Sequence, residues 1–308
     1  MKMLLHRTLM LLACSAQIAA AQSPQPVAVT SKSPASPADS APEIPDARLF
    51  HRSDLYVLSG FVAGTIAMFP LDRHMASVIR DEDLTQNKRI DEVARAFRFF
   101  GASGPYLIGG SMYAVGRLAG IHRAADLGLH GTEALVVGQT LSGVLKAMLG
   151  RARPYLSSDT NAHNFAFARG LKGGQYQSFP SGHATTAFAA AAAVSAETSE
   201  WWPRTKWIIG PILFGGATMV GVSRIYHDRH WASDVVMGAA VGTFAGLKTV
   251  RFNKTHTGNR LDRFFLGKGG GSSGPGDGGK GSVKTESLQI HLSLTPNGSP
   301  AIIANWQW

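Results

Sequence analysis

Six stretches of apolar and small residues, each long enough for a helix, recur along the middle of the chain. Alternation with the period of a β-strand is scarce there, and no internal repeat is visible. Because such stretches bury their apolar side chains against one another, the pattern predicts an all-α fold, a helix bundle of about six core helices. The stretches are 55–71, 104–121, 127–149, 184–199, 206–222 and 233–248.

An amphipathic segment at 84–100 lies between the first two of these stretches. Its apolar residues Ile90, Val93 and Phe97 recur at helical spacing and so share one face, whereas Lys88 and Arg89 point outward. This spacing predicts a further helix.

The N-terminal residues follow the pattern of an export signal. A basic start is followed by a short apolar run at 9–18 and by three alanines before Gln22. This order predicts a signal peptide over 1–21. Cys14 is the only cysteine and allows the alternative of a lipidated signal, although Leu12 fits that pattern poorly. With ordinary cleavage the mature protein has no cysteine, so its stability comes from packing rather than from disulfides.

Composition divides the rest of the chain into four parts. A segment rich in Pro, Ser and Ala precedes the helical stretches, and a linker rich in Gly and Ser from 267 follows them. The tail alternates apolar and polar residues around a Pro-Asn-Gly-Ser-Pro turn, which predicts a β-hairpin. The predicted parts are a flexible leader at 22–48, the helical body at 49–250, the linker at 251–282 and the hairpin tail at 283–308.

The chain is basic, with 30 Lys and Arg residues against 20 Asp and Glu residues and a formal net charge of +10. A positive field favours anionic partners such as phosphorylated substrates or an anionic membrane surface. Nucleic acid is not an expected partner, because no basic run with interleaved aromatic residues is present. We expect a phosphorylated lipid or small molecule as substrate and a membrane surface as partner. The sequence carries no signal for an oligomeric state.

Two arrangements of the helices stay open, a globular or peripheral bundle and an integral membrane bundle. The longest uncharged runs reach about 17 residues, at the low edge of what spans a bilayer. If 55–71, 104–121 and 127–145 all spanned after an exported N-terminus, the loop after 145 would face the cytoplasm. We therefore favour the globular or peripheral bundle, exported and associated with the periplasmic side of a membrane.

A first cluster of basic residues ends one helical stretch, where Lys146 and Arg153 are followed by Pro154. A point charge and a planar guanidinium suit phosphate oxygens, and the proline stops the helix so that this end enters a loop. Taken alone, the cluster equally fits favourable charge at a helix C-terminus.

A second cluster, Pro180-Ser181-Gly182-His183, precedes an Ala-rich helical stretch. Ser181 is a predicted N-cap, and the free N–H groups of a helix start, with a glycine that permits close approach, bind anions. His183 is placed to donate a proton. Taken alone, the cluster equally fits a capped helix with an incidental histidine.

A third cluster contains Ser223-Arg224 and then His230 and Asp234. The last two are four residues apart and so lie on one helix face. A carboxylate on one imidazole nitrogen fixes the tautomer and leaves the other nitrogen as a nucleophile or base. Taken alone, this is also the pattern of a surface His–Asp pair.

Together, the three clusters resemble the signature of the type 2 phosphatidic acid phosphatase (PAP2) superfamily. That superfamily includes bacterial class A acid phosphatases, membrane lipid phosphatases and vanadium haloperoxidases. The clusters occur in the family's order over 146–234 and depart from it at no motif position. The resemblance implies a PAP2-like helical fold over 55–248 and a phosphatase.

The resemblance also implies a role for each motif residue. His230 attacks phosphorus and forms a phosphohistidine, Asp234 orients His230, and His183 protonates the leaving oxygen and later activates water. The groups implied to bind the phosphoryl oxygens are Lys146, Arg153, Arg224, Ser181 and the Gly182 backbone N–H. Fixed cations and N–H donors stabilise the charge of a phosphoryl transition state, so neither a metal nor another cofactor is expected.

Two other functions stay open. In a vanadate-dependent haloperoxidase the same residues would hold vanadate as a cofactor and His230 would be a vanadium ligand, although haloperoxidases are usually longer chains. A non-catalytic envelope-binding protein would use the tail at 283–308 instead. The substrate also stays open among lipid phosphates, undecaprenyl pyrophosphate and soluble monoesters.

Residues near the motifs are predicted to be structural. Arg151 lies inside the first cluster but off its defined positions, and His227 lacks the offset of His230 from Arg224. Asp72 and Arg73 are predicted to form a structural ion pair. Glu133, in an apolar stretch, is predicted to be buried and hydrogen-bonded rather than to face the substrate pocket.

Overall fold

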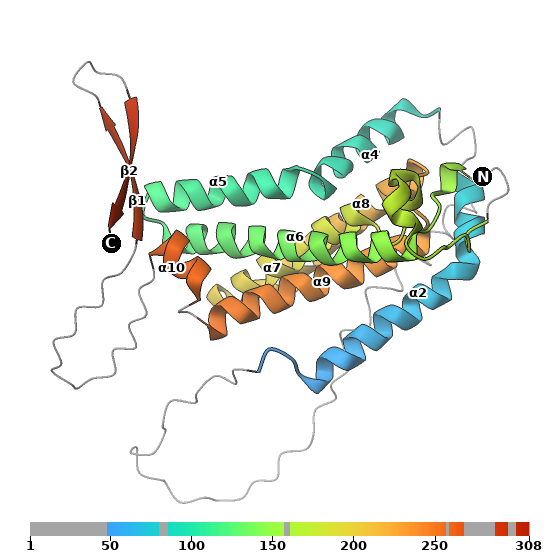
Figure 1. Cartoon of the computed structure of the whole chain (residues 1–308), viewed down its shortest axis with the longest axis horizontal. Helices are drawn as coiled ribbons and strands as arrows, with labels where there is room; N and C mark the ends of the chain where they lie inside the picture. The colour runs from blue at the N-terminus through green and yellow to red at the C-terminus, as the bar shows by residue number, and fades with distance from the viewer. Residues whose placement is uncertain are drawn as a thin grey trace, which may run out of the picture. The chain divides into compact units, whose positions relative to one another are not determined.

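The structure, a computed structural model, contains a bundle of long helices (Figure 1). It describes residues 48–79, 86–156, 161–256 and 259–267, together with the backbone of 287–294 and 300–307. The helices are α2 (Arg52–Ile79), α4 (Lys88–Gly101), α5 (Gly104–Leu118), α6 (His122–Leu149), α7 (Gly182–Trp201), α8 (Lys206–Tyr226), α9 (Ala232–Thr255) and α10 (Arg260–Leu266). Short 3₁₀ turns lie at Pro154–Leu156, Arg169–Lys172, Gly174–Tyr176 and Pro203–Thr205.

Helix termini follow from local sequence. Helix α4 begins after Asn87, whose side chain accepts hydrogen bonds from two backbone N–H groups of the first turn. Helix α6 ends at Gly150, which adopts the left-handed conformation (φ 52°) that a residue without a Cβ takes readily. Helix α7 begins after Ser181, whose side chain accepts from Ala184 N, so the predicted N-cap is confirmed.

Helices α7 and α9 meet through small residues. Glycines of α9 recur at intervals of four and face backbone carbonyls of α7. A Cβ at any of these glycines would come within 2.6 Å of the facing carbonyl oxygen, so only glycine permits this separation. The facing pairs are Gly238 with Ser181, Gly242 with Thr185, and Gly246 with Ala189. This contact fixes the start of α7 beside the start of α9.

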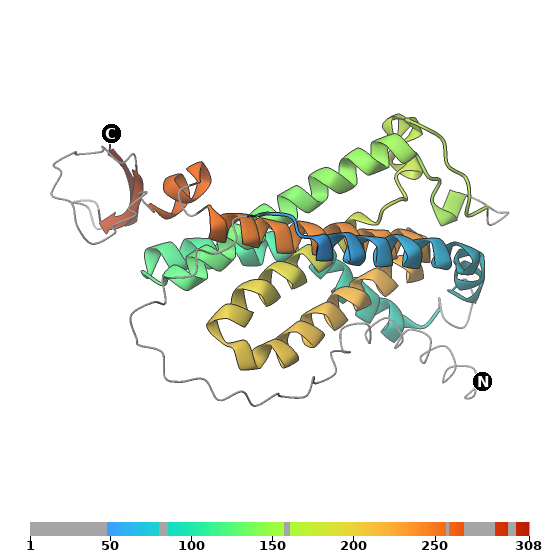
Figure 2. The same cartoon turned by 90° about the horizontal axis from the view of Figure 1, so that it is seen from below.

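Helices α7 and α8 form an antiparallel pair joined by the turn at Pro203–Thr205 (Figure 2). Ala187 and Ala191 of α7 pack with Ala217 and Val220 of α8 in a small buried cluster, and Phe97 of α4 packs on its edge. Helix α4 therefore contacts both, as expected for the apolar face of an amphipathic helix.

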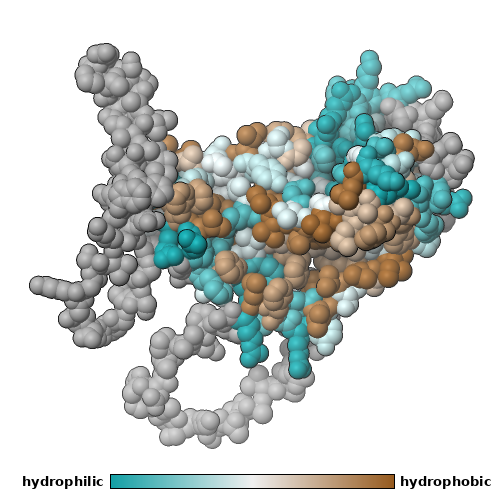
Figure 3. Space-filling view, in the orientation of Figure 1, coloured by the Kyte–Doolittle hydropathy of each residue, from teal (hydrophilic) through white to brown (hydrophobic). Residues whose placement is uncertain are grey.

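The surface of the bundle carries many exposed apolar side chains along α2, α5, α6 and α8, among them Leu55, Ile108, Val136 and Ile208. Figure 3 shows apolar surface along the bundle, with polar surface gathered over α4. Within the described residues, α2, α8 with its preceding turn, and α9 are long and apolar enough to cross a membrane. An exposed apolar surface of this extent favours a membrane-associated protein.

The membrane candidates differ from those in the sequence argument. The spans considered from sequence included 104–121 and 127–145, but neither α5 nor α6 is among the candidates. Helices α8 and α9, which are both candidates, instead meet at one end of the bundle, where the loop 227–231 joins them. The preference for a globular or peripheral bundle therefore gives way to a membrane protein.

Each predicted helical stretch coincides with a helix, but the C-terminal boundary of the body differs. Helix α9 continues past the predicted end at 250, and α10 follows within the predicted linker. Tyr113 donates a hydrogen bond to the Phe265 carbonyl (2.9 Å), and His130 Nε2 lies 3.3 Å from the Asp262 carboxylate. These tertiary contacts hold α10 on the bundle, and such contacts have no signal in local composition.

Strands β1 (Ser287–Leu294) and β2 (Pro300–Gln307) pair antiparallel, with Ser287 opposite Gln307. The predicted turn between them lies outside the described residues, so the hairpin as a whole stays a prediction. The predicted signal peptide, nearly all of the leader and the Gly/Ser linker from 268 also lie outside the described residues.

Adding a methyl group at Gly242 should destabilise the bundle, because its Cβ would overlap the Thr185 carbonyl of α7. We expect Gly242→Ala to lower the free energy of unfolding by roughly 1–3 kcal/mol. Gly143 of α6 has open space around it. Gly143→Ala should therefore be neutral or stabilise by up to about 1 kcal/mol. Denaturant unfolding in detergent measures both, and equal effects at the two glycines would contradict the proposed packing.

Candidate active site

His230 lies in the loop between α8 and α9 and is buried, with 3% of its surface exposed. Its Nδ1 lies 2.7 Å from the carbonyl oxygen of Ser178 and 3.5 Å from Oδ2 of Asp234. A carbonyl can only accept, so Nδ1 carries the proton and donates to Ser178. We assign the tautomer from this bond. The second ring nitrogen, Nε2, then keeps its lone pair.

Asp234, the predicted orienting carboxylate, is held by groups other than His230. It accepts hydrogen bonds from the Trp231 backbone N–H (2.9 Å) and from the Ser178 hydroxyl (2.5 Å), and it pairs with Arg151. Ser178 therefore contacts both His230 and Asp234, and its carbonyl is the nearer partner of the imidazole. Sequence reasoning gave this orienting role to Asp234 alone.

Arg151 is fully buried behind His230 and joins two carboxylates. One terminal nitrogen bonds Asp234, and the other lies 2.7 Å from Asp72 of α2. Asp72 also accepts from the backbone and hydroxyl of Ser233. The ion pair predicted between Asp72 and Arg73 is corrected, because adjacent helical residues point in different directions and Asp72 pairs with Arg151 instead.

Aromatic rings enclose the Arg151 guanidinium. Its central carbon lies 4.9–5.9 Å from four ring centroids, an arrangement in which the ring faces attract the cation. The rings belong to Phe69, Phe165, Phe179 and Trp231. The pair thus lies in a dry surrounding, where losing one charged partner is costly.

A cavity of about 350 Å³ lies in front of His230. Five residues predicted from the sequence line it together, although they come from three separate segments. They are Lys146, Arg153, Gly182, His183 and His230. The two imidazoles therefore face one hollow, which can hold a phosphate-sized anion between them.

Three other predicted residues lie outside that lining. Asp234 lies behind His230, and Arg224 lines a neighbouring cavity. Ser181 is fully buried, and its hydroxyl accepts from Ala184 N at 3.4 Å. Its side chain serves as the helix cap, and its contact with an anion stays a prediction.

Lys146 lies in the last turn of α6 and Arg153 lies in the loop after this helix, and both line the cavity. The Lys146 ammonium donates to the carbonyls of Gln177 (3.0 Å) and Pro180 (2.6 Å). Burial, with a smaller effect of the nearby Arg153, lowers the pKa of Lys146 to about 8. Burial likewise lowers the pKa of Arg153, whose guanidinium donates to the Gly174 carbonyl (2.9 Å). Both cations are thus held in place before an anion arrives.

The histidines are neutral in the empty site. Burial, followed by the positive charge of Arg224, lowers the pKa of His183 to about 3. Burial lowers the pKa of His230 to about 4, although the nearby Asp234 carboxylate acts in the opposite direction. A bound phosphate dianion would raise the pKa of His183, because it places negative charge where only cations now lie.

Sequence reasoning missed six residues of the cavity wall, and two of them have clear roles in its geometry. Gln139 donates to the Gly182 carbonyl (2.7 Å) and to the Thr186 hydroxyl (2.6 Å), tying α6 to the start of α7. Its spacing of seven residues from Lys146, two helical turns, is a signal that could have found it. Gly101 ends α4 against His183, where a Cβ would lie 2.9 Å from that of His183.

Glu133 lies away from this cavity and accepts a hydrogen bond from Asn253 (2.6 Å), in agreement with the prediction.

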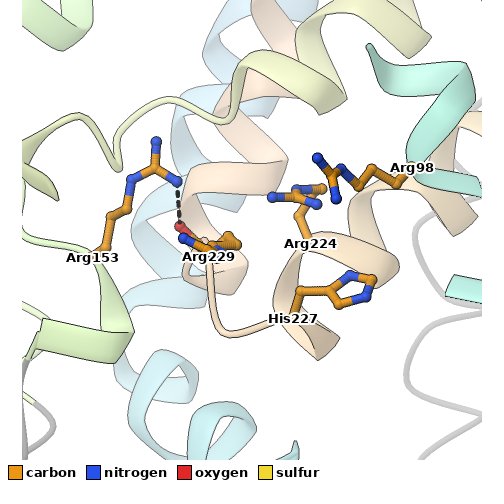
Figure 4. A pocket seen from close by; sticks show the side chains of 5 residues that line it. All are labelled: Arg98, Arg153, Arg224, His227 and Arg229. Atoms are coloured by element: carbon orange, nitrogen blue, oxygen red, sulfur yellow. Dashed lines mark hydrogen bonds between the residues drawn. The ribbon is translucent and has the colours of Figure 1, made fainter. Parts of the chain in front are cut away.

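A second cavity is lined by Arg98, Arg153, Arg224, His227 and Arg229 (Figure 4). In the part of the chain that the structure describes, no group of three or more His, Cys, Asp or Glu residues is arranged to hold a metal ion.

Replacing Arg151 should destabilise the protein strongly, because Asp72 and Asp234 would lose their shared buried counter-charge. We expect Arg151→Gln to cost about 3–5 kcal/mol of unfolding free energy. Arg89→Gln removes the same charge from an exposed position and should cost less than about 0.5 kcal/mol. Unfolding in detergent compares the variants, and a loss below about 1 kcal/mol for Arg151→Gln would refute the central role of this ion pair.

The His230 ring should stay neutral, with its proton on Nδ1, as the pH falls to about 4. Below that value the ring becomes protonated and Nε2 loses its lone pair. Nitrogen-15 NMR of histidine-labelled protein measures both the pKa and the tautomer, and the signal is assigned by its loss in His230→Ala. A midpoint near the ordinary histidine value of about 6.5 would contradict the burial of this ring.

Three comparisons with known proteins bear on this geometry. A family model described as the PAP2 superfamily matches residues 129–257. A lipid A 1-phosphatase of Porphyromonas gingivalis is 40% identical over 90 residues, covering 28% of this chain and 19% of the relative. An undecaprenyl-diphosphatase of Sulfolobus acidocaldarius is 28% identical over 127 residues, covering 40% of this chain and 58% of the relative.

The solved structure of a transmembrane PAP2 type phosphatidylglycerolphosphate phosphatase from Bacillus subtilis is 21% identical, with a TM-score of 0.49. The alignment covers 68% of this chain and 100% of that chain. The chain spans less than two thirds of the length of each of the two curated relatives named above. The segment matched by the family model contains all eight predicted site residues, from Lys146 to Asp234. Residues 129–257 therefore belong to the PAP2 superfamily.

Proposed function

We propose that this chain is a metal-independent phosphatase that hydrolyses lipid phosphate esters through a phosphohistidine intermediate. The observation that carries the proposal is the shared cavity, in which His183 and His230 face one anion-sized space beside Lys146 and Arg153. Its relatives include proteins named lipid A 1-phosphatase and undecaprenyl-diphosphatase, which supports the reaction class.

In the first step, His230 Nε2 attacks phosphorus with its lone pair, and the bond between phosphorus and the leaving oxygen breaks. His183, protonated once the anion is bound, donates its proton to that oxygen. Positive charge at His230 is balanced by the Asp234 carboxylate behind it, through the contact at 3.5 Å. The lipid alcohol then leaves.

In the second step, neutral His183 takes a proton from a water molecule, and the hydroxide formed attacks the phosphorus of the phosphohistidine. The P–N bond breaks, its electron pair returns to His230 Nε2, and orthophosphate is released. The cations Lys146, Arg153 and Arg224 stabilise the negative charge of both transition states. This assignment leaves no step that needs a metal ion.

An apolar cavity supports a lipid substrate. Its volume is about 530 Å³, and Phe97, Phe100, Leu135 and Ile212 are among its lining residues. Phe100 directly precedes Gly101, which lines the polar cavity, so the apolar and polar spaces lie on consecutive residues of α4. We assign the apolar cavity to the hydrocarbon chain of the substrate, because burial of a chain in such a space is favourable.

The side of the membrane that the site faces is also part of this proposal. We propose that the chain is exported and that the polar cavity faces the periplasm. The sequence pattern at 1–21 supports export. The segments 150–156, 161–181 and 227–231 carry the site at one end of the bundle, which is compatible with catalysis at a membrane surface.

Phosphate release from a lipid monophosphate in detergent with EDTA tests the proposal. We expect His230→Ala to lower kcat by at least about 10³-fold and His183→Ala by about 10²–10⁴-fold. The exposed His122→Ala variant serves as control and should retain wild-type activity. Vanadate should inhibit, because it mimics the phosphoryl group.

A rapid alkaline quench with phosphorus-32 substrate should leave label on the wild type and none on His230→Ala, since phosphohistidine survives in alkali. Strict dependence on a divalent metal would rule the proposal out. Halide oxidation with vanadate and peroxide, in place of phosphate release, would favour the haloperoxidase instead.

A further inference from the structure

A second polar cavity adjoins the first and is lined almost entirely by cations. Its volume is about 320 Å³, and its five lining residues are four arginines and His227, with no carboxylate among them. Arg153 lines both cavities, so the two spaces are neighbours. Figure 4 shows the guanidinium of Arg98, from α4, beside that of Arg224, from α8, while Arg153 approaches from the other side.

Arg224 also indicates that an anion binds on this side of the site. The residue is 95% buried, since 5% of its surface is exposed, and its Nε has no hydrogen-bond partner. Buried donors are almost always satisfied in native proteins. Two guanidinium groups side by side also repel each other unless an anion lies between them. An unpaired donor and uncompensated charge in one cavity together indicate an anionic ligand.

None of the five lining side chains can supply that anion. Asp91 lies 3.4 Å from Nε2 of His227, but it pairs with Arg95 and is not part of the cavity lining. Arg229 lies over the Tyr155 ring, 5.1 Å from its centroid, which holds this guanidinium at the cavity edge.

Helix α4 also connects this cavity to the apolar one. Phe97 and Phe100 line the apolar cavity, and Arg98 lies between them in sequence and faces the cation-lined cavity. A substrate with its chain against the two phenylalanines and its scissile phosphoryl group at His230 would lie along the end of α4 that carries Arg98. A second anionic group directly next to the scissile phosphoryl group would then fit the cation-lined cavity, because the two polar cavities share Arg153.

We propose, building on the function proposed above, that Arg98 and Arg229 form a second phosphate subsite, and that the preferred substrates are lipid diphosphates. His230 attacks the terminal phosphorus, the bond to the bridging oxygen breaks, and the electron pair leaves with a lipid monophosphate. Arg98 and Arg229 neutralise the inner phosphate before and after cleavage. Water then releases the terminal phosphate from His230 as orthophosphate.

Farnesyl diphosphate and farnesyl monophosphate, which share one chain, test the subsite in detergent. Arg98→Gln and Arg229→Gln should each raise KM for the diphosphate about tenfold or more and change KM for the monophosphate less than about threefold. Arg89→Gln is the matched control, because it removes the same charge from the exposed start of α4. It should leave both KM values unchanged.

Inorganic pyrophosphate and orthophosphate, used as competitive inhibitors, test the subsite without a lipid chain. Pyrophosphate should inhibit the wild type at least about tenfold more strongly than orthophosphate, and Arg98→Gln should reduce this ratio. The wild-type ratio stands even if a variant fails to fold.

Equal losses on the two farnesyl substrates, or no loss on either, would overturn the subsite. Equal inhibition by pyrophosphate and orthophosphate would overturn it too. If the wild type releases phosphate from neither substrate, the phosphatase proposal itself fails. Phosphate release with an unchanged diphosphate preference in Arg98→Gln defeats the subsite alone.

Discussion

One buried guanidinium group fixes the relative positions of the chain segments that form the candidate active site. Arg151 binds Asp72 of α2 and Asp234 of α9 at once, and it comes from the loop that follows α6. Three elements distant in sequence are thus joined at a single charged group. Because the surrounding rings exclude water, neither carboxylate can exchange Arg151 for solvent at low cost. The position of Asp234, and through Ser178 that of His230, follows from this ion-pair network.

Charge is separated across the site. The carboxylates lie behind His230 and pair with Arg151, whereas the lining of the two cavities contains lysine and arginine side chains but no carboxylate. An incoming anion therefore meets uncompensated positive charge on one side only. Burial, followed by the charge of the nearby cations, lowers the pKa of His183 and keeps it neutral in the empty site. In the proposed mechanism, the bound anion reverses the effect of the cations, so that His183 can act as an acid. Substrate binding and activation of the acid thus arise from one electrostatic arrangement.

The helical fold and the cluster around the cavity could be predicted from sequence because both leave local signals. Long apolar stretches mark helices, and Ser181 and Pro154 mark ends of helices. Arg151 and Asp72 could not be paired in this way, since their partners lie about eighty residues away and neither has a local pattern. Arg98 belongs to an amphipathic helix, and its spacing alone does not distinguish a solvent-facing charge from a ligand. Helix α10 was missed because its contacts with α5 and α6 are tertiary.

The glycine contact between α7 and α9 sets the spacing of the two candidate catalytic histidines through the main chain itself. His183 lies at the start of α7, and His230 lies just before the start of α9. Their separation is therefore set by backbone packing rather than by long, flexible side chains. Bilayers of different thickness are accommodated chiefly by tilt of lipid-facing helices. Because close contacts between the glycines of α9 and the carbonyl groups of α7 hold these helices together, the two helices tilt as one rigid unit. The distance between His183 and His230 across the cavity therefore does not depend on the composition of the surrounding lipid.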